Sequence, residues 1–346
     1  MIWAIYIALL LLVMILIGTI MKNFDLLKAS IIPRRSSHTT NAYLGGGIYI
    51  LCGMLIINLF HTPNIEVQKI IFGSIIFGFI GLVDDFWTIH FKWKLILQLF
   101  ATSIFLYWNN LFLTTLDFSF ITISIGWIGL IITTLAVLLV VNAFNYLDGL
   151  DGLYLMIFLL MITILQSLIQ GGDYGNLILA FSLMCLIFLI ANFAFLGMPK
   201  QFLGDGGNYM LSFFIAMFYL QNIQTSNFSV SLNGQVFGLW FFGLLLFEFL
   251  AVSLIRLLQQ KSIFIPDRDH LHHVVYDKLN QHGKVSLIIA GIYLLLTMIG
   301  LVMTIYFAKY SFALYVALLS IYVWARVSYK RNLIKTEDLQ GNKGVS

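Results

Sequence analysis

Four polar side chains recur every three residues in the segment 142–153, which has the sequence NAFNYLDGLDGL. They are Asn142, Asn145, Asp148 and Asp151, and a glycine follows each aspartate. A spacing of three places side chains along one flank of a helix as it leaves a membrane. Carboxylate and carboxamide oxygens are typical ligands of Mg²⁺ or of a magnesium-bound phosphate. A glycine-capped helix end is the alternative for one Asp-Gly pair, but the repeat favours a binding site.

Two adjacent carboxylates, Asp84 and Asp85, close another apolar run in the sequence GLVDDFWTIHFKWK. Neighbouring carboxylates at the edge of a membrane repel each other and lose hydration, so the pair favours a nearby cation or a proton-transfer role over a hydrated helix end. Lys94 opens the next apolar run beside the aspartates and is placed to face a phosphate. For Lys92, two explanations fit equally well: it faces a phosphate, or it belongs to the excess of basic residues on the cytoplasmic side of membrane proteins.

A single carboxylate, Asp205, lies between glycines in the segment 202–209, FLGDGGNY. Glycines let a backbone approach a phosphate, and a helix N-terminus favours an anion. A carboxylate at this place therefore needs a metal ion between itself and a phosphate. A glycine-flanked turn without a ligand is the alternative.

The segment 266–273, PDRDHLHH, combines one arginine with three histidines: Arg268, His270, His272 and His273. The spacing of the histidines raises a zinc site as an alternative, but the cysteines and the four-ligand spacing of structural zinc sites are missing. Guanidinium and imidazole donors together suit a diphosphate better. A solvated loop is the remaining alternative.

Two further features carry less specific signals. His38 follows two arginines in the segment 33–38, where lipid headgroups and membrane topology also favour basic residues. Glu248 lies deep in an apolar run, where an acid is either functional or the hydrogen-bonded partner of a residue such as tyrosine.

The composition identifies a membrane protein. Of the 346 residues, 60% are hydrophobic and 10% are charged, whereas soluble domains are about half apolar and about a quarter charged. The first apolar run, 2–21, lacks a basic lead-in and a small-residue cleavage site, so we expect a retained helix rather than a signal peptide. Cys52 and Cys185 lie inside apolar runs and are expected to be unpaired.

Apolar runs that fit membrane spans predict an all-α, polytopic protein of about eleven transmembrane helices. The runs are 2–21, 44–60, 69–83, 95–108, 127–143, 153–169, 177–196, 209–220, 236–255, 285–307 and 312–328. We expect one catalytic domain over 1–328 and a cytoplasmic tail over 329–346. The alternation DFSFITIS between two runs predicts a small periplasmic hairpin.

The basic residues give the orientation. With the N-terminus outside and the C-terminus in the cytoplasm, only Lys69 and Lys309 of the 19 lysines and arginines fall on the outer side. The same topology places all the polar segments described above on the cytoplasmic face.

Taken together, GLVDD, NAFNYLDGLDGL, FLGD and PDRDHLHH resemble the polyprenyl-phosphate N-acetylhexosamine-1-phosphate transferases, integral-membrane enzymes of the glycosyltransferase 4 type. The resemblance covers residues 33–273 in order. PDRDHLHH is similar to the branch that uses UDP-GlcNAc and an undecaprenyl-phosphate acceptor.

The resemblance implies roles for individual residues. It implies that Asp205 and Asn145 bind Mg²⁺, with Mn²⁺ as an alternative. It implies catalytic roles for Asp84, Asp85, Lys94 and His270, in which the aspartates prepare the lipid phosphate or support the metal and the lysine neutralises phosphate. It implies substrate binding by Asn142, Asp148, Asp151, Arg268, His272, His273 and His38.

The resulting expectation is transfer of N-acetylhexosamine-1-phosphate, with GlcNAc favoured, from a UDP-sugar to undecaprenyl phosphate with release of UMP. FucNAc, QuiNAc or GalNAc are alternative sugars. This reaction would be the first membrane step of a cell-surface polysaccharide such as O-antigen, in the bacterial inner membrane with the site facing the cytoplasm. A homodimer is compatible with the resemblance, and no nucleic-acid partner is expected. The residues leave open whether an aspartate or the lipid phosphate attacks phosphorus.

Three rival functions fit the sequence less well. A secondary transporter that uses Glu248 predicts acids at the bilayer midplane, but most acids here fall at one face. An intramembrane aspartyl protease needs glycine where Phe202 stands, and a CDP-alcohol phosphotransferase needs Ala-Arg where Leu150-Asp151 stand.

Overall fold

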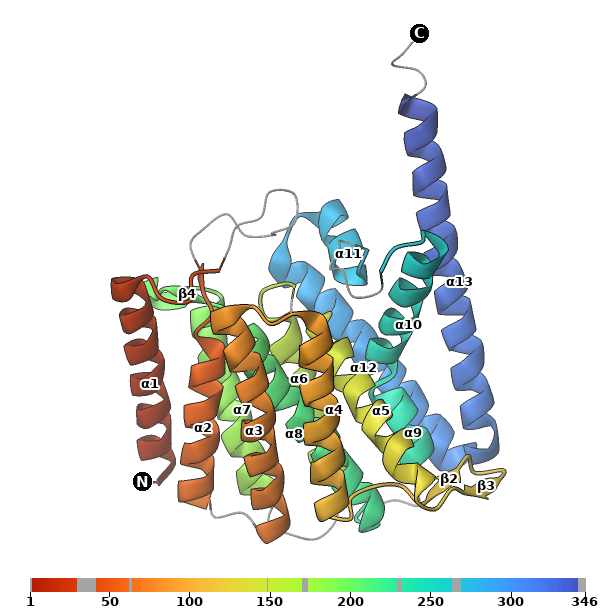
Figure 1. Cartoon of the computed structure of the whole chain (residues 1–346), viewed down its shortest axis with the longest axis horizontal. Helices are drawn as coiled ribbons and strands as arrows, with labels where there is room; N and C mark the ends of the chain where they lie inside the picture. The colour runs from red at the N-terminus through yellow and green to blue at the C-terminus, as the bar shows by residue number, and fades with distance from the viewer. Residues whose placement is uncertain are drawn as a thin grey trace.

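The computed structural model of the chain describes residues 2–29, 42–61, 64–147, 149–169, 174–228, 232–262 and 269–341, and gives only the backbone of residues 196 and 334–341. Within these ranges the protein is almost entirely helical. Figure 1 shows most of the helices side by side in a single bundle. The all-α, polytopic fold expected from the sequence is therefore confirmed.

The first half of the bundle contains α1 (Ile2–Phe24), α2 (Gly46–His61), α3 (Ile65–Trp87), α4 (Phe91–Trp108), α5 (Ile128–Asn145), α6 (Leu153–Leu168) and α7 (Tyr174–Asn192). The second half contains α8 (Gly204–Gln224), α9 (Gly234–Phe241), α10 (Gly243–Leu258), α11 (Leu271–Leu279), α12 (His282–Tyr306) and α13 (Ala308–Gly341). The remaining elements are short: β1 (Ala42–Tyr43), β2 (Thr115–Asp117), β3 (Thr122–Ser124), β4 (Lys200–Gln201) and the 3-10 turn η1 (Phe195–Gly197).

Several of these helices can cross a membrane by length and composition. In the described part of the chain they are α1, α3, α5, α7, α12 and the part Ala308–Leu333 of α13. The run 236–255 is broken, because α9 and α10 meet at an angle of 61°. Kinks of this size are commonly found beside glycine, and Gly243 begins α10.

Helix α8 lies at the centre of the bundle, packed against α2, α3 and α5. Nearly all of its side chains are buried, including the polar residues Asn208 and Ser212. The hydroxyl of Tyr154 on α6 donates to the carbonyl of Asn208 at 2.9 Å. Because α8 is enclosed by neighbouring helices, its first turn is held in a fixed place relative to them.

The contact between α3 and α8 depends on a glycine. A Cβ atom at Gly81 would lie 2.3 Å from the carbonyl oxygen of Asp205, which is far below van der Waals contact. The absence of a side chain at residue 81 therefore lets the end of α3 approach the start of α8.

The ends of the bundle differ. Strands β2 and β3 pair in antiparallel fashion, which confirms the hairpin expected from the alternating sequence. Figure 1 shows this hairpin at the bottom, with the start of α1, and α11 with the far end of α13 at the top. Helix α13 continues without a break through residue 328, so the expected tail boundary falls inside a helix. Cys52 and Cys185 are unpaired, as expected.

Candidate active site

Four side chains from four helices meet where α3 ends and α8 begins. The Nζ atom of Lys94, in the first turn of α4, lies 2.6 Å from Oδ2 of Asp84 and 2.6 Å from Oδ2 of Asp205. Asn145, the last residue of α5, donates from Nδ2 to Oδ1 of Asp205 at 2.9 Å. We call Asp84, Lys94, Asn145 and Asp205 the carboxylate cluster. The structure thus brings together residues that are up to 121 positions apart in the sequence.

Backbone and ring contacts hold the carboxylate cluster in shape. Oδ1 of Asp84 accepts a hydrogen bond from the backbone N–H of Ile89 at 2.6 Å, which fixes the carboxylate at the turn between α3 and α4. The ammonium of Lys94 lies 5.6 Å from the ring centre of Tyr209, within range of a cation–π interaction. Lys92 is exposed, so of the two lysines only Lys94 faces the acids.

Asp85 plays a different part from its neighbour. Its two carboxylate oxygens accept the backbone N–H groups of Asp205 and Gly206, at 2.9 and 3.0 Å. These N–H groups belong to the first turn of α8, where a helix has no partners of its own for them. Asp85 therefore caps α8 and positions Asp205.

The charges of the carboxylate cluster depend on one another. Lys94 and Asp205 lie just outside the apolar runs 95–108 and 209–220 expected to cross the bilayer. Burial disfavours the ammonium of Lys94, but the neighbouring Asp205 outweighs burial and raises the pKa of Lys94 above its ordinary value. Burial raises the pKa of Asp205, and the charge of Lys94 opposes that rise. Lys94 thus remains positive and stabilises the two acids that it joins.

The carboxylate cluster offers the donors that suit a magnesium ion. Mg²⁺ in phosphate-transfer sites is held by one or two carboxylates, and substrate phosphates and water complete its ligands. Asp84, Asn145 and Asp205 supply hard oxygen atoms of this kind. Among the described residues, no group of three His, Cys, Asp or Glu side chains is arranged to hold a metal by itself. The residues present therefore fit an ion that enters with its phosphate substrate rather than one bound in a closed protein cage.

The expectation that one helix flank carries the whole repeat in 142–153 is wrong. Helix α5 ends at Asn145, and Gly152 adopts a left-handed backbone, with φ of 76°, before α6 begins. Asn142, inside α5, donates to Oε1 of Gln98 at 3.0 Å. Asp151 lies in the turn before α6 and pairs with Lys200 at 2.7 Å. The spacing of three is therefore distributed over a helix end and a turn.

The histidine segment lies next to this turn. His270, His272 and His273 are all buried. The ring of His270 lies 4.4 Å from the ring of Tyr146, which directly follows Asn145. A Cβ atom at Gly149 would lie 2.2 Å from Nε2 of His272, so the glycine allows this histidine to approach. Two motifs separated by more than 100 residues thus face each other beside the carboxylate cluster.

Three of the predicted site residues lie outside the described residues. They are His38, Asp148 and Arg268. Their roles in substrate binding stay predictions, as do those of the described residues.

The structure also adds residues that the sequence did not single out. Arg256 is buried at the end of α10, and its guanidinium lies 3.4 Å from Nε2 of His270 and 5.5 Å from the ring centre of Tyr146. In the sequence, Arg256 was explained by membrane orientation alone. A basic residue at a helix end carries no signal of burial, so only the fold could reveal its contact with the histidine segment.

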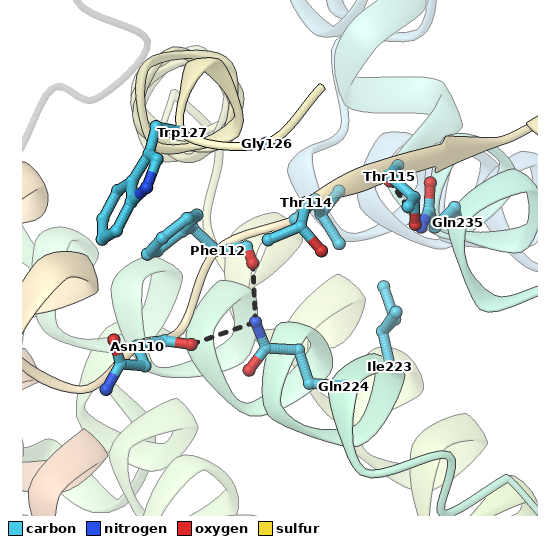
Figure 2. A pocket seen from close by; sticks show the side chains of 10 residues that line it. Asn110, Phe112, Thr114, Thr115, Gly126, Trp127, Ile223, Gln224 and Gln235 are labelled. Atoms are coloured by element: carbon cyan, nitrogen blue, oxygen red, sulfur yellow. Dashed lines mark hydrogen bonds between the residues drawn. The ribbon is translucent and has the colours of Figure 1, made fainter. Parts of the chain in front are cut away.

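A separate cavity lies at the end of the bundle away from the carboxylate cluster. Figure 2 shows this cavity, of about 670 Å³, between the loop around Phe112, Trp127 at the start of α5, and Gln224 at the end of α8. The side-chain amide of Gln224 donates to the backbone carbonyls of Asn110 and Phe112, at 3.3 and 2.8 Å. All the residues that line this cavity are uncharged. Unlike the carboxylate cluster, its lining therefore offers no charged side chain.

In comparisons with known proteins, the part of the chain that matches a family contains the carboxylate cluster. The profile described as glycosyl transferase family 4 matches residues 67–223, which include the whole carboxylate cluster. The undecaprenyl-phosphate alpha-N-acetylglucosaminyl 1-phosphate transferase of Escherichia coli O157:H7 is 27% identical over 250 residues, covering 70% of this chain and 67% of that protein. The protein of the same name from Yersinia pestis is 26% identical over 277 residues, covering 78% and 74%.

A relative from Bacillus subtilis has a similar name. The probable undecaprenyl-phosphate N-acetylglucosaminyl 1-phosphate transferase of Bacillus subtilis (strain 168) is 28% identical over 238 residues, covering 66% of this chain and 64% of that protein. The carboxylate cluster, the helical membrane fold and these matches agree: over residues 67–223 the chain is similar to glycosyl transferase family 4.

Proposed function

We propose that this protein transfers N-acetylglucosamine-1-phosphate from UDP-GlcNAc to undecaprenyl phosphate and releases UMP. The observation that carries the proposal is the carboxylate cluster, in which Lys94 joins Asp84 and Asp205 and Asn145 completes the group. The names of the relatives support the acceptor and the sugar.

Transfer between two phosphates suits a site that consists mainly of charged side chains. In the net reaction, an oxygen of the lipid phosphate forms a bond to the β-phosphorus of the nucleotide sugar, and the bond from that phosphorus to the oxygen of UMP breaks. Both reactants are anions, so the protein must mainly align them and neutralise their repulsion. Lys94 carries the positive charge for this task, and Asp84 and Asp205 hold its ammonium at the site.

Asp205 and Asn145 would hold a magnesium ion. Asp84 would contribute by its ion pair with Lys94, which also contacts Asp205. Bound there, the ion would supply positive charge against the diphosphate. The backbone N–H groups at the start of α8 are already used by Asp85, so they keep Asp205 in place rather than bind phosphate.

The histidine segment is the proposed contact for the diphosphate and the amino sugar. His270, His272 and His273 are buried beside the turn that follows Asn145. Imidazole N–H groups can donate to phosphate and carbonyl oxygens. These imidazole donors, next to the carboxylate cluster, would align the phosphates.

The acceptor chain needs an apolar path. A pocket of about 280 Å³ lies between α5, α8, α9 and α10, and its lining is almost entirely apolar, with Val140 and Leu246 among its residues. Val140 precedes Asn145 by five residues, which is about 7.5 Å along a helix. We propose that a polyprenyl chain approaches from this side, so that its phosphate meets the nucleotide sugar at the cytoplasmic face of the inner membrane.

One assay tests the proposed reaction. Purified protein with Mg²⁺, UDP-GlcNAc and undecaprenyl phosphate is expected to release UMP. The variant Asp205→Asn removes a charge but keeps the size of the side chain, and it should lower turnover by about a hundredfold or more. Asp25→Asn, at an exposed residue, is the matched control and should behave as wild type.

Three results would each contradict a different part of the proposal. Wild-type turnover in Asp205→Asn would remove the carboxylate cluster from catalysis. A panel of UDP-N-acetyl sugars identifies the donor, because faster UMP release with another sugar would replace GlcNAc. No release with any of them would contradict the proposed function itself.

A further inference from the structure

A second group of polar and charged side chains, buried or half-buried, lies between α10, α13 and the residues that lead into α11. It consists of Glu248, Asp269, Tyr322, Arg326 and Lys330, and we call it the Glu248 network. The side chains of Glu248 and Arg326 are 3% and 8% exposed. The family profile ends at residue 223, so it assigns no role to any of these residues.

Helix α13 fixes the carboxylate of Glu248. Nη2 of Arg326 lies 3.2 Å from Oε1 of Glu248, and the hydroxyl of Tyr322 donates to Oε2. Tyr322 and Arg326 are four residues apart on α13, so they lie on one face of the helix. Both oxygens of Glu248 are therefore held by the same helix.

The network in turn holds the residues on either side of His270. The backbone N–H of Leu271, the first residue of α11, donates to Oε1 of Glu248 at 2.6 Å. The guanidinium of Arg326 donates to the backbone carbonyl of Asp269, and Lys330 pairs with the carboxylate of Asp269 at 2.5 Å. His270 lies between two residues that are both anchored by the network.

The anchored histidine points toward the candidate active site. Its Nδ1 lies 3.8 Å from Oε1 of Glu248, and its ring packs 4.4 Å from Tyr146 on the other side. Since Tyr146 follows Asn145, a displacement of His270 would change the wall of the site next to the carboxylate cluster.

We propose that Arg326 and Tyr322 of the C-terminal helix are positioning residues that act through Glu248 to hold His270 at the active site. Stability alone is a poor explanation for the Glu248 network, because replacing a buried ion pair by apolar residues is often neutral or stabilising. The contacts to Asp269 and Leu271, by contrast, fix one particular backbone conformation. The link to catalysis rests on the proposed function, whereas the link between α13 and the histidine segment does not.

Hydrogen exchange tests the positioning without any assay of activity. In the wild type, the N–H of Leu271 is bonded to Glu248 and should exchange slowly. In Arg326→Met and in Tyr322→Phe we expect amide exchange in residues 269–279 to rise by about tenfold, because each change removes one of the contacts that hold the carboxylate of Glu248. Exchange in α3 and α8 should stay unchanged. Arg331→Met, at an exposed position on the same helix, is the matched control.

Kinetics then separate positioning from general stability. Arg326→Met should lower kcat/KM for the nucleotide sugar by about tenfold in the wild type but by less than about twofold when combined with His270→Ala, because both changes act on one group. Tyr322→Phe removes only a hydroxyl and provides a second variant if Arg326→Met folds poorly.

Two results would overturn the inference: unchanged exchange in residues 269–279 in both variants, or losses that multiply fully in the double variant. An inactive wild-type protein would instead contradict the proposed function, and the exchange measurement would still decide whether α13 holds the histidine segment.

Discussion

At the scale of single residues, the most informative feature is that neighbouring acids have separate tasks. Asp84 contacts Lys94, whereas Asp85 caps helix α8. The sequence shows two identical residues in a row and cannot distinguish them. On a helix, adjacent side chains point about 100° apart, so one faced α4 and the other faced α8 once the helices had packed.

The capping role of Asp85 makes a specific prediction for stability. Asp85→Ala removes the partners of two N–H groups and should lower the free energy of unfolding by about 1–3 kcal/mol. Asp85→Asn keeps one acceptor oxygen and should lose less. Thermal unfolding in detergent measures both, with Asp25→Ala as the exposed control. Equal stability of Asp85→Ala and wild type would show that the cap is dispensable.

The sequence singled out Asp84, Lys94, Asn145 and Asp205, and the structure brings these four side chains together, while their roles in catalysis stay predictions. Asn142 and Asp151 instead face Gln98 and Lys200. Their partners lie far away in the sequence, and nothing in the local pattern indicates them.

At the scale of elements, the site depends on how closely α3 approaches α8. Gly81 allows this approach, and Asp85 joins the end of one helix to the start of the other. Both residues belong to α3, and both act on its contact with the first turn of α8.

Replacing Gly81 tests this contact. Gly81→Ala places a Cβ atom 2.3 Å from the carbonyl oxygen of Asp205, and overpacking of this kind costs about 1–3 kcal/mol. We expect lower thermal stability together with lower UMP release, because Asp205 moves. Gly291→Ala in α12 is the control, since a Cβ atom there meets nothing within 4 Å. A fully active and stable Gly81→Ala would show that the approach of the helices is not critical.

Hydrophobicity predicted the existence of the helices better than their ends. It predicted the runs that became α1, α3, α5, α7 and α12, since a long apolar segment has few alternatives to a helix in a membrane. It predicted the end of α5 to within two residues but did not predict the break between α9 and α10. These limits depend on glycines and on neighbouring helices, which a count of apolar residues ignores.

At the scale of the whole molecule, the two ends of the bundle differ in the charged and ionisable groups that they carry. The carboxylate cluster and the histidine segment lie at the end where α3 finishes, and the uncharged cavity of Figure 2 lies at the other. Lys69 and Lys309, the two basic residues expected outside, lie near the starts of α3 and α13, at the end away from the carboxylate cluster. With the predicted orientation, which stays a prediction, the carboxylate cluster would face the cytoplasm.

The overall fold class could be predicted because composition alone excludes a soluble domain. The convergence of distant helices on one site could be expected only from the family resemblance, since spacing within a motif says nothing about contacts across 121 residues. The sequence offered a tyrosine as one partner of Glu248 but did not indicate that α13 supplies it, because Tyr322 and Arg326 look like ordinary residues of a membrane-spanning helix and its positively charged end.

The position of the metal ion tests the central claim most directly. A crystal of the protein with Mn²⁺ and UDP-GlcNAc, measured at the manganese absorption edge, would locate the ion by its anomalous signal. The account predicts one peak about 2.0–2.3 Å from a carboxylate oxygen of Asp205, beside Asn145 and the diphosphate. A peak among His270, His272 and His273, or no ordered manganese at the carboxylate cluster when the nucleotide sugar is bound, would contradict it.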